Sequence, residues 1–508
     1  MIARTAAWAA ALIAAVAVAR PVGPARADGL GDLDDLDGGA PPAIPDDARP
    51  ITLADAIAGA RAHNPGYQAA VARHDAARAR VGAAAGVDDL VIEASATGLT
   101  RAASPVAGAF LDETAVDAIG ARVGLWQPLP WGGRVGLEVG DDVVRSTARI
   151  AIGGPVDDRT STIHQPRAEL VWQQPLLRDR GRAHHGAARA LAAAGADLED
   201  AARRGAETTL VLDVARAYWE LAYAERAVAI RVSALARARD QLAVTQARAA
   251  VGKVSELEVA TAQQAIAAGE AAWLAAAQDR AARAVDLRVL LGDDGAAGRP
   301  LTAADPLTDA GAAPATADAV ARALAFAPGL RALGHQARAA AIEVDVAAAD
   351  LRPRLDLIVR GGPSGHADDA GAAWAQLGRF DGYQASAALA FAFPVGNRLA
   401  RGQRDAARAE QRRVELEGAA LEGAITAATI RAVDAVALSD RRITAAAAAV
   451  ALARRTAELE RDRWRAGAGT NLDVVIRQDQ AVAAEVALAR AQVDRRLALA
   501  ALAALTGP

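Results

Sequence analysis

The chain has 508 residues, with 57 lysines and arginines against 61 aspartates and glutamates and a formal net charge of −4. This balance provides no basic face for nucleic acid, whose phosphates require clustered positive charge. Cysteine is absent, which excludes disulfides, thiolate chemistry and lipid attachment at a cysteine. Hydrophobic residues make up 53% of the chain but aromatic residues only 3%, and the abundant alanine favours closely packed helices.

Residues 1–27 have the features of a secretory signal peptide. Arg4 precedes an apolar run over residues 5–19, which is too short to span a bilayer, and Ala25-Arg26-Ala27 forms a small-residue cleavage site. We expect residues 28–50, rich in Asp, Gly and Pro, to be a flexible leader. No later segment is predicted to be a membrane helix. A secreted chain of this kind is periplasmic, extracellular or inserted in an outer membrane as strands.

The rest of the chain contains two unequal repeats. Asn64-Pro65-Gly66 reappears 263 residues later as Ala327-Pro328-Gly329, whereas Leu290-Leu291-Gly292 reappears 215 residues later as Leu505-Thr506-Gly507. The difference between these offsets gives the first repeat 48 extra residues. Pairing Pro175 with Pro394 places 44 of them before Pro175, among strand-like segments. We therefore predict a first structural repeat at 51–300, a linker at 301–314 and a second repeat at 315–508.

Each repeat predicts the same order of helices around its strands. The expected helices are 53–86, 181–250 and 254–291 in the first repeat, and 315–350, 399–465 and 470–505 in the second. The long helix carries a seven-residue apolar series, which favours left-handed supercoiling, at Val214, Leu221, Val228, Leu235 and Leu242. A helix near 70 residues spans roughly 100 Å, and two short helices end to end match it. Such chains form coiled-coil rods or stand side by side as a cylinder.

Between the helices the apolar period changes to two. Residues 135–140 alternate valine or leucine with glycine and glutamate, and similar alternation occurs at 90–100, 121–126, 168–173, 355–360 and 387–393. Strands with one apolar face suit a membrane β-barrel, although a soluble β-domain makes the same pattern. The polar, glycine-bearing stretches at 101–117, 141–164 and 361–381 are expected to be exposed loops.

Aromatic side chains gather near these strands, as an interfacial girdle at a membrane would require. They are Trp126, Trp131, Trp172, Tyr383, Phe391 and Phe393. The chain supplies four strands if the insertion stays outside the barrel and six if it is included. Neither number encloses a lumen, and an open strand edge cannot face lipid. A membrane barrel would therefore have to be shared between chains.

Together these features resemble the outer membrane efflux protein family typified by TolC. The resemblance covers residues 51–507. It rests on Leu53-Ala54-Asp55-Ala56-Ile57 with Asn64-Pro65, on Gln173-Gln174-Pro175-Leu176-Leu177-Arg178, and on the duplicated turns at 251–259 and 466–474. It implies a mostly α-helical homotrimer, with a periplasmic α-barrel of coiled-coil helices and a transmembrane β-barrel in outer-membrane lipid. It further implies a passive exit duct of a tripartite efflux or type I secretion system. An inner-membrane pump would deliver substrates through a periplasmic adaptor (membrane fusion) protein.

The resemblance also assigns two sites. The family's tip motif, Val-Gly-Leu-x-Ser/Thr, has Lys253 in place of leucine here, and glycine also ends helices routinely. The implied adaptor-docking residues are Val251, Gly252, Lys253, Val254, Ser255, Ala466, Gly467 and Thr470. The implied periplasmic entrance comprises Glu258, Trp464 and Asp473. The carboxylates of Glu258 and Asp473 would favour cations. Gly469 stands where the family has an arginine, so we expect a closed state to depend on packing more than on charged latches.

Two other classes of function were weighed. Enzymatic activity is not expected, because the seven histidines are scattered and no glycine-rich phosphate loop follows a strand; no cofactor or metal site is predicted. A soluble periplasmic coiled-coil adaptor or scaffold would explain the signal peptide and the heptads. It would not explain strand blocks inserted in both repeats.

Overall fold

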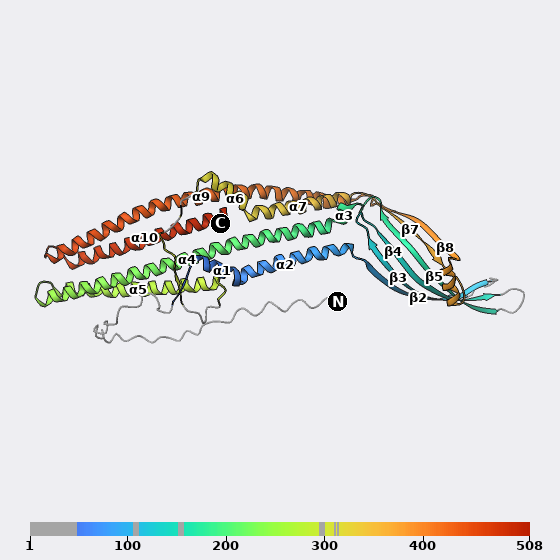
Figure 1. The fold of residues 1–508 in the computed structure, drawn as a ribbon, viewed down its shortest axis with the longest axis horizontal. Helices are drawn as coiled ribbons and strands as arrows, with labels where there is room; N and C mark the ends of the chain where they lie inside the picture. The colour runs from blue at the N-terminus through green and yellow to red at the C-terminus, as the bar shows by residue number, and fades with distance from the viewer. Residues whose placement is uncertain are drawn as a thin grey trace. The chain divides into compact units, whose positions relative to one another are not determined.

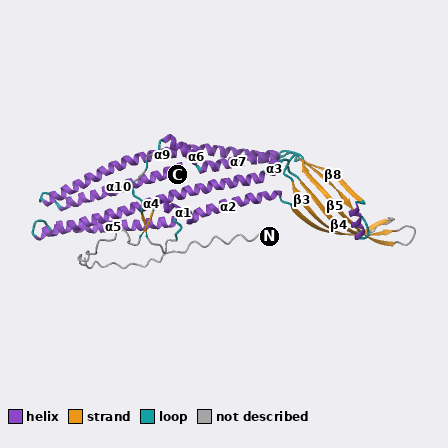
Figure 2. Ribbon diagram, viewed as in Figure 1, coloured by secondary structure: helices purple, strands orange, loops and turns teal. Residues whose placement is uncertain are grey.

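The computed structural model describes residues 48–104, 111–150, 157–293, 300–308, 311 and 314–507. The expected signal peptide and nearly all of the expected leader lie outside these residues. Helices account for most of the described chain, and they follow the predicted order in both repeats (Figures 1 and 2). No helix in the described ranges combines the length and apolar character needed to cross a membrane.

The two repeats have matching helices. The first repeat has α1 (Leu53–His63), α2 (Pro65–Ala85), α4 (Ala187–Ala250) and α5 (Glu256–Leu290), after a short α3 (Arg182–His185). The second has α6 (Thr316–Phe326), α7 (Pro328–Ala349), α9 (Arg398–Arg465) and α10 (Asn471–Thr506). The first expected helix of each repeat is broken in two, because Pro65 and Pro328 lack an N–H and stand at a helix start. Asn64 caps the second piece by accepting a hydrogen bond from the Tyr67 N–H.

The helices stand in a row of four columns (Figure 1). The first column contains α1, α2 and α5, all packed on α4, which is the second column. The third column contains α7 and α10, which contact both α4 and α9. The fourth column is α9, and α6 lies beside α9 and α10. The predicted heptad seam is confirmed over its first four positions, because Val214, Leu221, Val228 and Leu235 on α4 are buried, whereas Leu242 is half-buried. A single chain therefore forms a wall with two outer columns: the first, made of α1, α2 and α5, and the fourth, made of α9.

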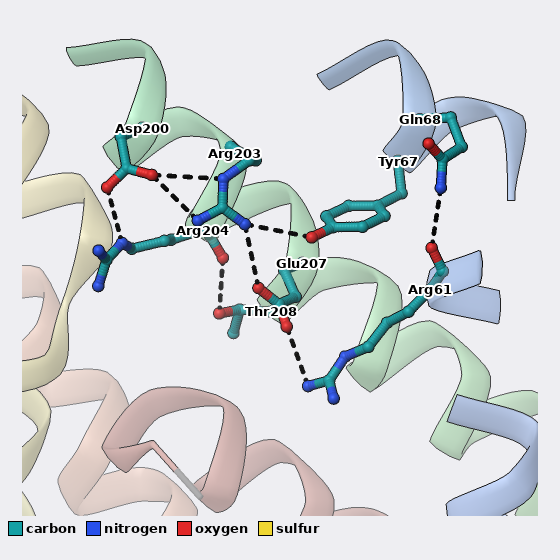
Figure 3. Close-up of polar contacts among 8 residues, drawn as sticks. All are labelled: Arg61, Tyr67, Gln68, Asp200, Arg203, Arg204, Glu207 and Thr208. Atoms are coloured by element: carbon teal, nitrogen blue, oxygen red, sulfur yellow. Dashed lines mark hydrogen bonds and ion pairs between the residues drawn. The ribbon is translucent and has the colours of Figure 1, made fainter. Parts of the chain in front are cut away.

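A polar network joins the broken helix pair to α4 (Figure 3). Arg203 donates to Asp200 at 3.0 Å and to the Tyr67 hydroxyl at 3.2 Å, and Arg61 pairs with Glu207 at 3.0 Å. Burial alone would raise the pKa of Asp200, but hydrogen bonds from Arg203 and a neighbouring arginine outweigh burial and lower it. These contacts fix the α1–α2 break against the long helix.

The connection between the repeats packs on the middle of α4. Residues 301–303, within the expected linker, form β6 (Leu301–Ala303), which pairs in parallel with β1 (Arg49–Ile51). The buried Tyr218 hydroxyl donates to Asp305 at 2.8 Å, and the buried Glu225 carboxylate accepts from the Ala303 N–H at 3.1 Å and faces Arg280 at 3.6 Å. Burial raises the pKa of Glu225. This part of the connection is thus fixed on the helices.

The strands form one antiparallel sheet of six, which answers the question of four or six strands that the sequence left open. Its order is β2 (Val91–Ala102), β3 (Leu111–Pro128), β4 (Arg134–Ile150), β5 (Asp157–Pro175), β7 (Arg354–Ser364) and β8 (Gly382–Ala392). The first repeat contributes four strands and the second two. The surplus residues before Pro175 therefore provide the two additional strands.

Two of the expected loops are largely strand. β3, β4 and β5 extend into 101–117 and 141–164, and the third expected loop contains α8 (Ala370–Arg379). The prediction was wrong because it required an apolar face, whereas these outer segments are held by backbone pairing and hydroxyl contacts. Ser146 meets Ser161 at 3.2 Å and Thr147 meets Thr160 at 3.0 Å across β4 and β5.

Candidate functional site

One face of the sheet is apolar and exposed. Val123 on β3 lies opposite Val139 on β4, and Leu125 lies opposite Leu137. These side chains are exposed in the single chain, together with Ile92, Ile119, Leu170, Trp172 and Leu389. A continuous apolar surface on one side of a sheet is suited to contact with lipid.

The opposite face carries charge. Arg122 and Asp142 form an ion pair at 3.0 Å, and Arg167 also contacts Asp142. Arg360 on β7 faces Glu138 on β4 at 3.8 Å. Because successive side chains alternate between faces, the same strands present apolar groups on one side and paired charges on the other. This is the arrangement of a wall between lipid and water.

The six aromatics expected at a membrane interface do not share one environment. Trp172, Tyr383 and Phe391 lie on the apolar face and are exposed, as is Phe393 just past β8. Trp131 is half-exposed in the β3–β4 turn and donates to Gln174 at 2.9 Å.

Trp126 is different, and its expected lipid-facing position is wrong. It is 3% exposed and lies on the charged face, where the Arg134 guanidinium stacks 4.1 Å from its ring centroid. A Cβ at Gly136 would come within 2.4 Å of the indole. The ring therefore lies flat on a glycine in the neighbouring strand. The glycines at 124 and 136, close to Trp126 in the sequence, are the pattern from which this packing could have been predicted.

The two helical hairpins end in nearly identical turns. Gly252 joins α4 to α5 with φ +66°, and Gly467 joins α9 to α10 with φ +80°, conformations that glycine adopts without strain. The amide of the next residue donates to the carbonyl of Arg248 in the first turn and of Arg463 in the second, both at 2.9 Å. The duplicated turns quoted from the sequence thus have one geometry. Val251 projects from the first tip and is 66% exposed.

Helix α10 begins with a capping box. The Thr470 hydroxyl and the Asp473 carboxylate each accept from the other's backbone N–H, at 3.2 Å and 3.3 Å. Hydrogen bonds from the Thr470 side chain and backbone lower the pKa of the exposed Asp473. Asp473 is therefore held as a carboxylate anion at the start of α10.

Trp464 is the centre of a cluster behind the tips. Its side chain is 1% exposed, and its indole N–H donates to Glu258 at 3.1 Å. Arg248 on α4 stacks 4.5 Å from the indole centroid and donates to the Trp464 carbonyl at 2.9 Å and to the Arg465 carbonyl. The structure thus brings Trp464 and Glu258 together.

Two buried polar groups complete this cluster. Asn471, at the start of α10, donates to the Glu258 carbonyl at 3.0 Å and accepts from Gln241 on α4 at 2.8 Å. Sequence reasoning missed Arg248, Asn471 and Gln241, although Arg248 stands three residues before the tip motif. Arg248 binds the carbonyl end of α9, so a charged side chain contributes to the contacts behind the tips.

The histidine pair at the strand-to-helix corner has carboxylate partners. His184 contacts Asp179 at 3.2 Å and His185 contacts Asp88 at 2.7 Å. Each contact joins α3 to a neighbouring segment. Within the part of the chain that the structure describes, no three His, Asp or Glu side chains gather as a metal site would require.

Comparison with known proteins gives consistent matches. The family model described as outer membrane efflux protein matches residues 174–293 and 319–508. The outer-membrane channel OprN is 18% identical, with a TM-score of 0.65 over 90% of this chain and 89% of that one. VceC of Vibrio cholerae is 18% identical, with a TM-score of 0.65 over 90% and 96%, and the open-state MtrE channel of Neisseria gonorrhoeae is 18% identical, with a TM-score of 0.64 over 90% and 88%. No curated protein matches by sequence.

Proposed function

Because the chain belongs to the outer membrane efflux protein family, we propose that three copies assemble into one passive duct leading from the periplasm across the outer membrane. The protein is an outer-membrane efflux channel whose helices extend into the periplasm. Residues 1–27 would be removed as a signal peptide during export, leaving residues 28–50 as a leader before the two repeats.

The row of helices carries the proposal. Its outer columns expose apolar side chains at intervals along their length, namely Leu257, Leu274, Val285 and Val289 on α5 and Leu416, Leu438, Leu452 and Leu459 on α9. Apolar area left in water costs about 25 cal/mol per Å². Copies standing side by side would cover both columns, α9 of one against α5 of the next, and turn an open row into a closed ring.

We further propose that a periplasmic adaptor docks on the hairpin tips and links the duct to an inner-membrane pump. Val251 and Leu257 offer exposed apolar contacts, and Lys253 offers a cation. Docking would extend over residues 251–255 of the first tip and over Ala466, Gly467 and Thr470 of the second. The adaptor surface that fits these tips is apolar with an acidic rim.

The entrance lies beside these tips. Glu258 is bound to Trp464 within the chain, whereas the Asp473 carboxylate is exposed. Three copies of Asp473 around a narrow opening would attract cations and bind multivalent ones.

Solubility and conductance test the proposal together. The full-length protein should require detergent for extraction from membranes, migrate at the mass of three chains and conduct ions in planar bilayers. A monomer released without detergent would instead support the soluble scaffold. A detergent-requiring particle that does not conduct would contradict the duct.

A further inference from the structure

The outermost strands of the sheet are unpaired on one side within the described chain. β2 pairs only with β3, and β8 only with β7, in the recorded sheet order. All twelve residues of β2 are exposed, and so is every residue of β8 after Gly382. An unpaired backbone group in lipid costs several kcal/mol, so each edge requires a partner strand.

The directions and lengths of these edges match each other. Six strands in strictly antiparallel order make β2 and β8 run in opposite directions. β2 has 12 residues and β8 has 11. β8 of one copy and β2 of the next would therefore pair antiparallel, as all other neighbours do.

The strand register, taken with edge strands that end at the same level where two copies meet, sets how far the sheet is sheared. Direct cross-strand partners follow one line across the sheet, through Val91, Trp126, Gly136, Val171, Arg360 and Ser386. Val91 is the first residue of β2, whereas Ser386 stands six residues before Ala392, the last residue of β8. Six residues rise about 20 Å along a strand. Six strand spacings, five within the chain and one between neighbouring copies, cover about 29 Å. The ratio gives a tilt of about 35°, within the range of membrane barrels.

One register at the junction follows if the two edge strands end at the same level. Symmetry puts all β2 starts at one level and all β8 ends at one level, and we take these two levels to coincide because β2 begins just after the α2 helix and β8 ends just before α9, so Val91 meets Ala392 of the neighbouring copy. Ser386 then lies opposite Thr97 on the charged face. On the apolar face Phe391 lies opposite Ile92, with Leu389 opposite Ala94. Because six is an even number of residues, side chains of the apolar face meet the apolar face of the next copy, and side chains of the charged face meet its charged face.

We propose that β2 of one copy pairs with β8 of the next in this register, and that three copies close a barrel of 18 strands. The proposal rests on the trimer of the proposed function and adds its contact, register and pore size. Eighteen strands tilted by about 35° enclose a ring about 34 Å across between opposite strand axes. Such barrels leave an aqueous channel. The outer-membrane part of the duct is thus wide, water-filled and lined by paired charges, and fits large hydrated solutes.

Disulfide cross-linking tests the junction cleanly, because the natural chain has no cysteine. In the double variant S386C/T97C, mild oxidation should convert most of the protein into covalent dimers and trimers that reductant restores to monomer. The matched control is S386C/G98C, because Gly98 neighbours Thr97 but its substituent points to the opposite face, out of disulfide reach. Equal cross-linking in the control, or none in S386C/T97C, would overturn the register.

A second pair tests whether all six strands belong to the barrel. Ala96 and Ala121 lie opposite each other on β2 and β3. In A96C/A121C an intrachain disulfide should form in the membrane-inserted protein and leave the oligomer unlinked. If β3 and β4 lay outside the barrel, β2 would border β5 and this disulfide would not form, which would reduce the count below 18.

The same samples separate the two proposals. Detergent extraction, particle mass and conductance of the cysteine variants report on the duct itself. A conducting trimer without the junction disulfide contradicts only the strand pairing. A non-conducting monomer contradicts the proposed function, and the barrel with it.

Discussion

Removing the Arg248 side chain should loosen the hairpin tips from each other. Arg248 joins α4 to the end of α9 by two hydrogen bonds to backbone carbonyls and by stacking on Trp464. Two hydrogen bonds from a half-exposed guanidinium contribute about 0.5–1 kcal/mol each. The cation–π contact adds about 0.5–1 kcal/mol. Arg248→Ala should therefore shift the opening equilibrium of the tips by about 2 kcal/mol, which is about 30-fold.

Amide hydrogen exchange measures this opening. Amides at residues 464–470 should exchange about 30-fold faster in Arg248→Ala, while those of the α4–α9 core remain unchanged. Arg216→Ala is the matched control, because Arg216 lies on the same helix and, among the residues that the structure describes, its ion pair is an exposed one with Asp213. Arg248→Lys should fall between the two, since it keeps the charge but loses the paired donors. Equal exchange at the tips in Arg248→Ala and Arg216→Ala would show that Arg248 does not hold the hairpin tips together.

Four further results are expected. Asp473→Asn should lower single-channel cation selectivity and weaken block by multivalent cations, and unchanged selectivity would remove Asp473 from the entrance. Gly136→Ala should destabilise the protein by about 1–3 kcal/mol by pushing the Trp126 ring, seen as a lower melting temperature, whereas Gly98→Ala has open space and should not. Lys253→Glu should weaken capture of an acidic-rimmed adaptor in pull-down, with Lys253→Arg as the control; equal capture by all three argues against docking through this cation. Because the pKa of Asp200 is lowered, its contribution to stability is complete above the ordinary pKa of 3.8 and is lost as the pH falls through the lowered pKa. Asp200→Asn should therefore have a lower melting temperature than the natural protein at pH 7. Its melting temperature should also fall less between pH 5 and pH 2.

The helical half of the fold was predictable because its signals are local and repeated. The heptad from Val214 to Leu235 specifies one buried stripe, and that stripe is buried in the structure. The prolines at 65 and 328 ended helices where the sequence analysis had extended them. The periodic pattern does not distinguish a proline in the first turn of a helix from a proline inside one. The distinction depends on the residue before the proline, which is disfavoured in the helical conformation.

The sheet and the tip cluster were harder to predict because they depend on partners distant in sequence. The outer parts of β4 and β5 are held by backbone pairing and hydroxyl contacts such as Thr147 to Thr160, which leave no apolar alternation. Trp126 looks like any interfacial tryptophan until Gly136 is placed opposite it. Arg248 meets Trp464 only because two hairpins from different repeats end at the same level. Contacts between separate segments decide all three, and no single segment encodes them.

A closed duct requires neighbouring copies to cover the outer columns of the helix row. Electron cryo-microscopy of the protein in lipid nanodiscs tests this most directly. It should show a ring of three chains, with α9 of each against α5 of the next and the exposed leucines of both covered. A lone chain in which α9 has folded back onto its own α5 would contradict the duct.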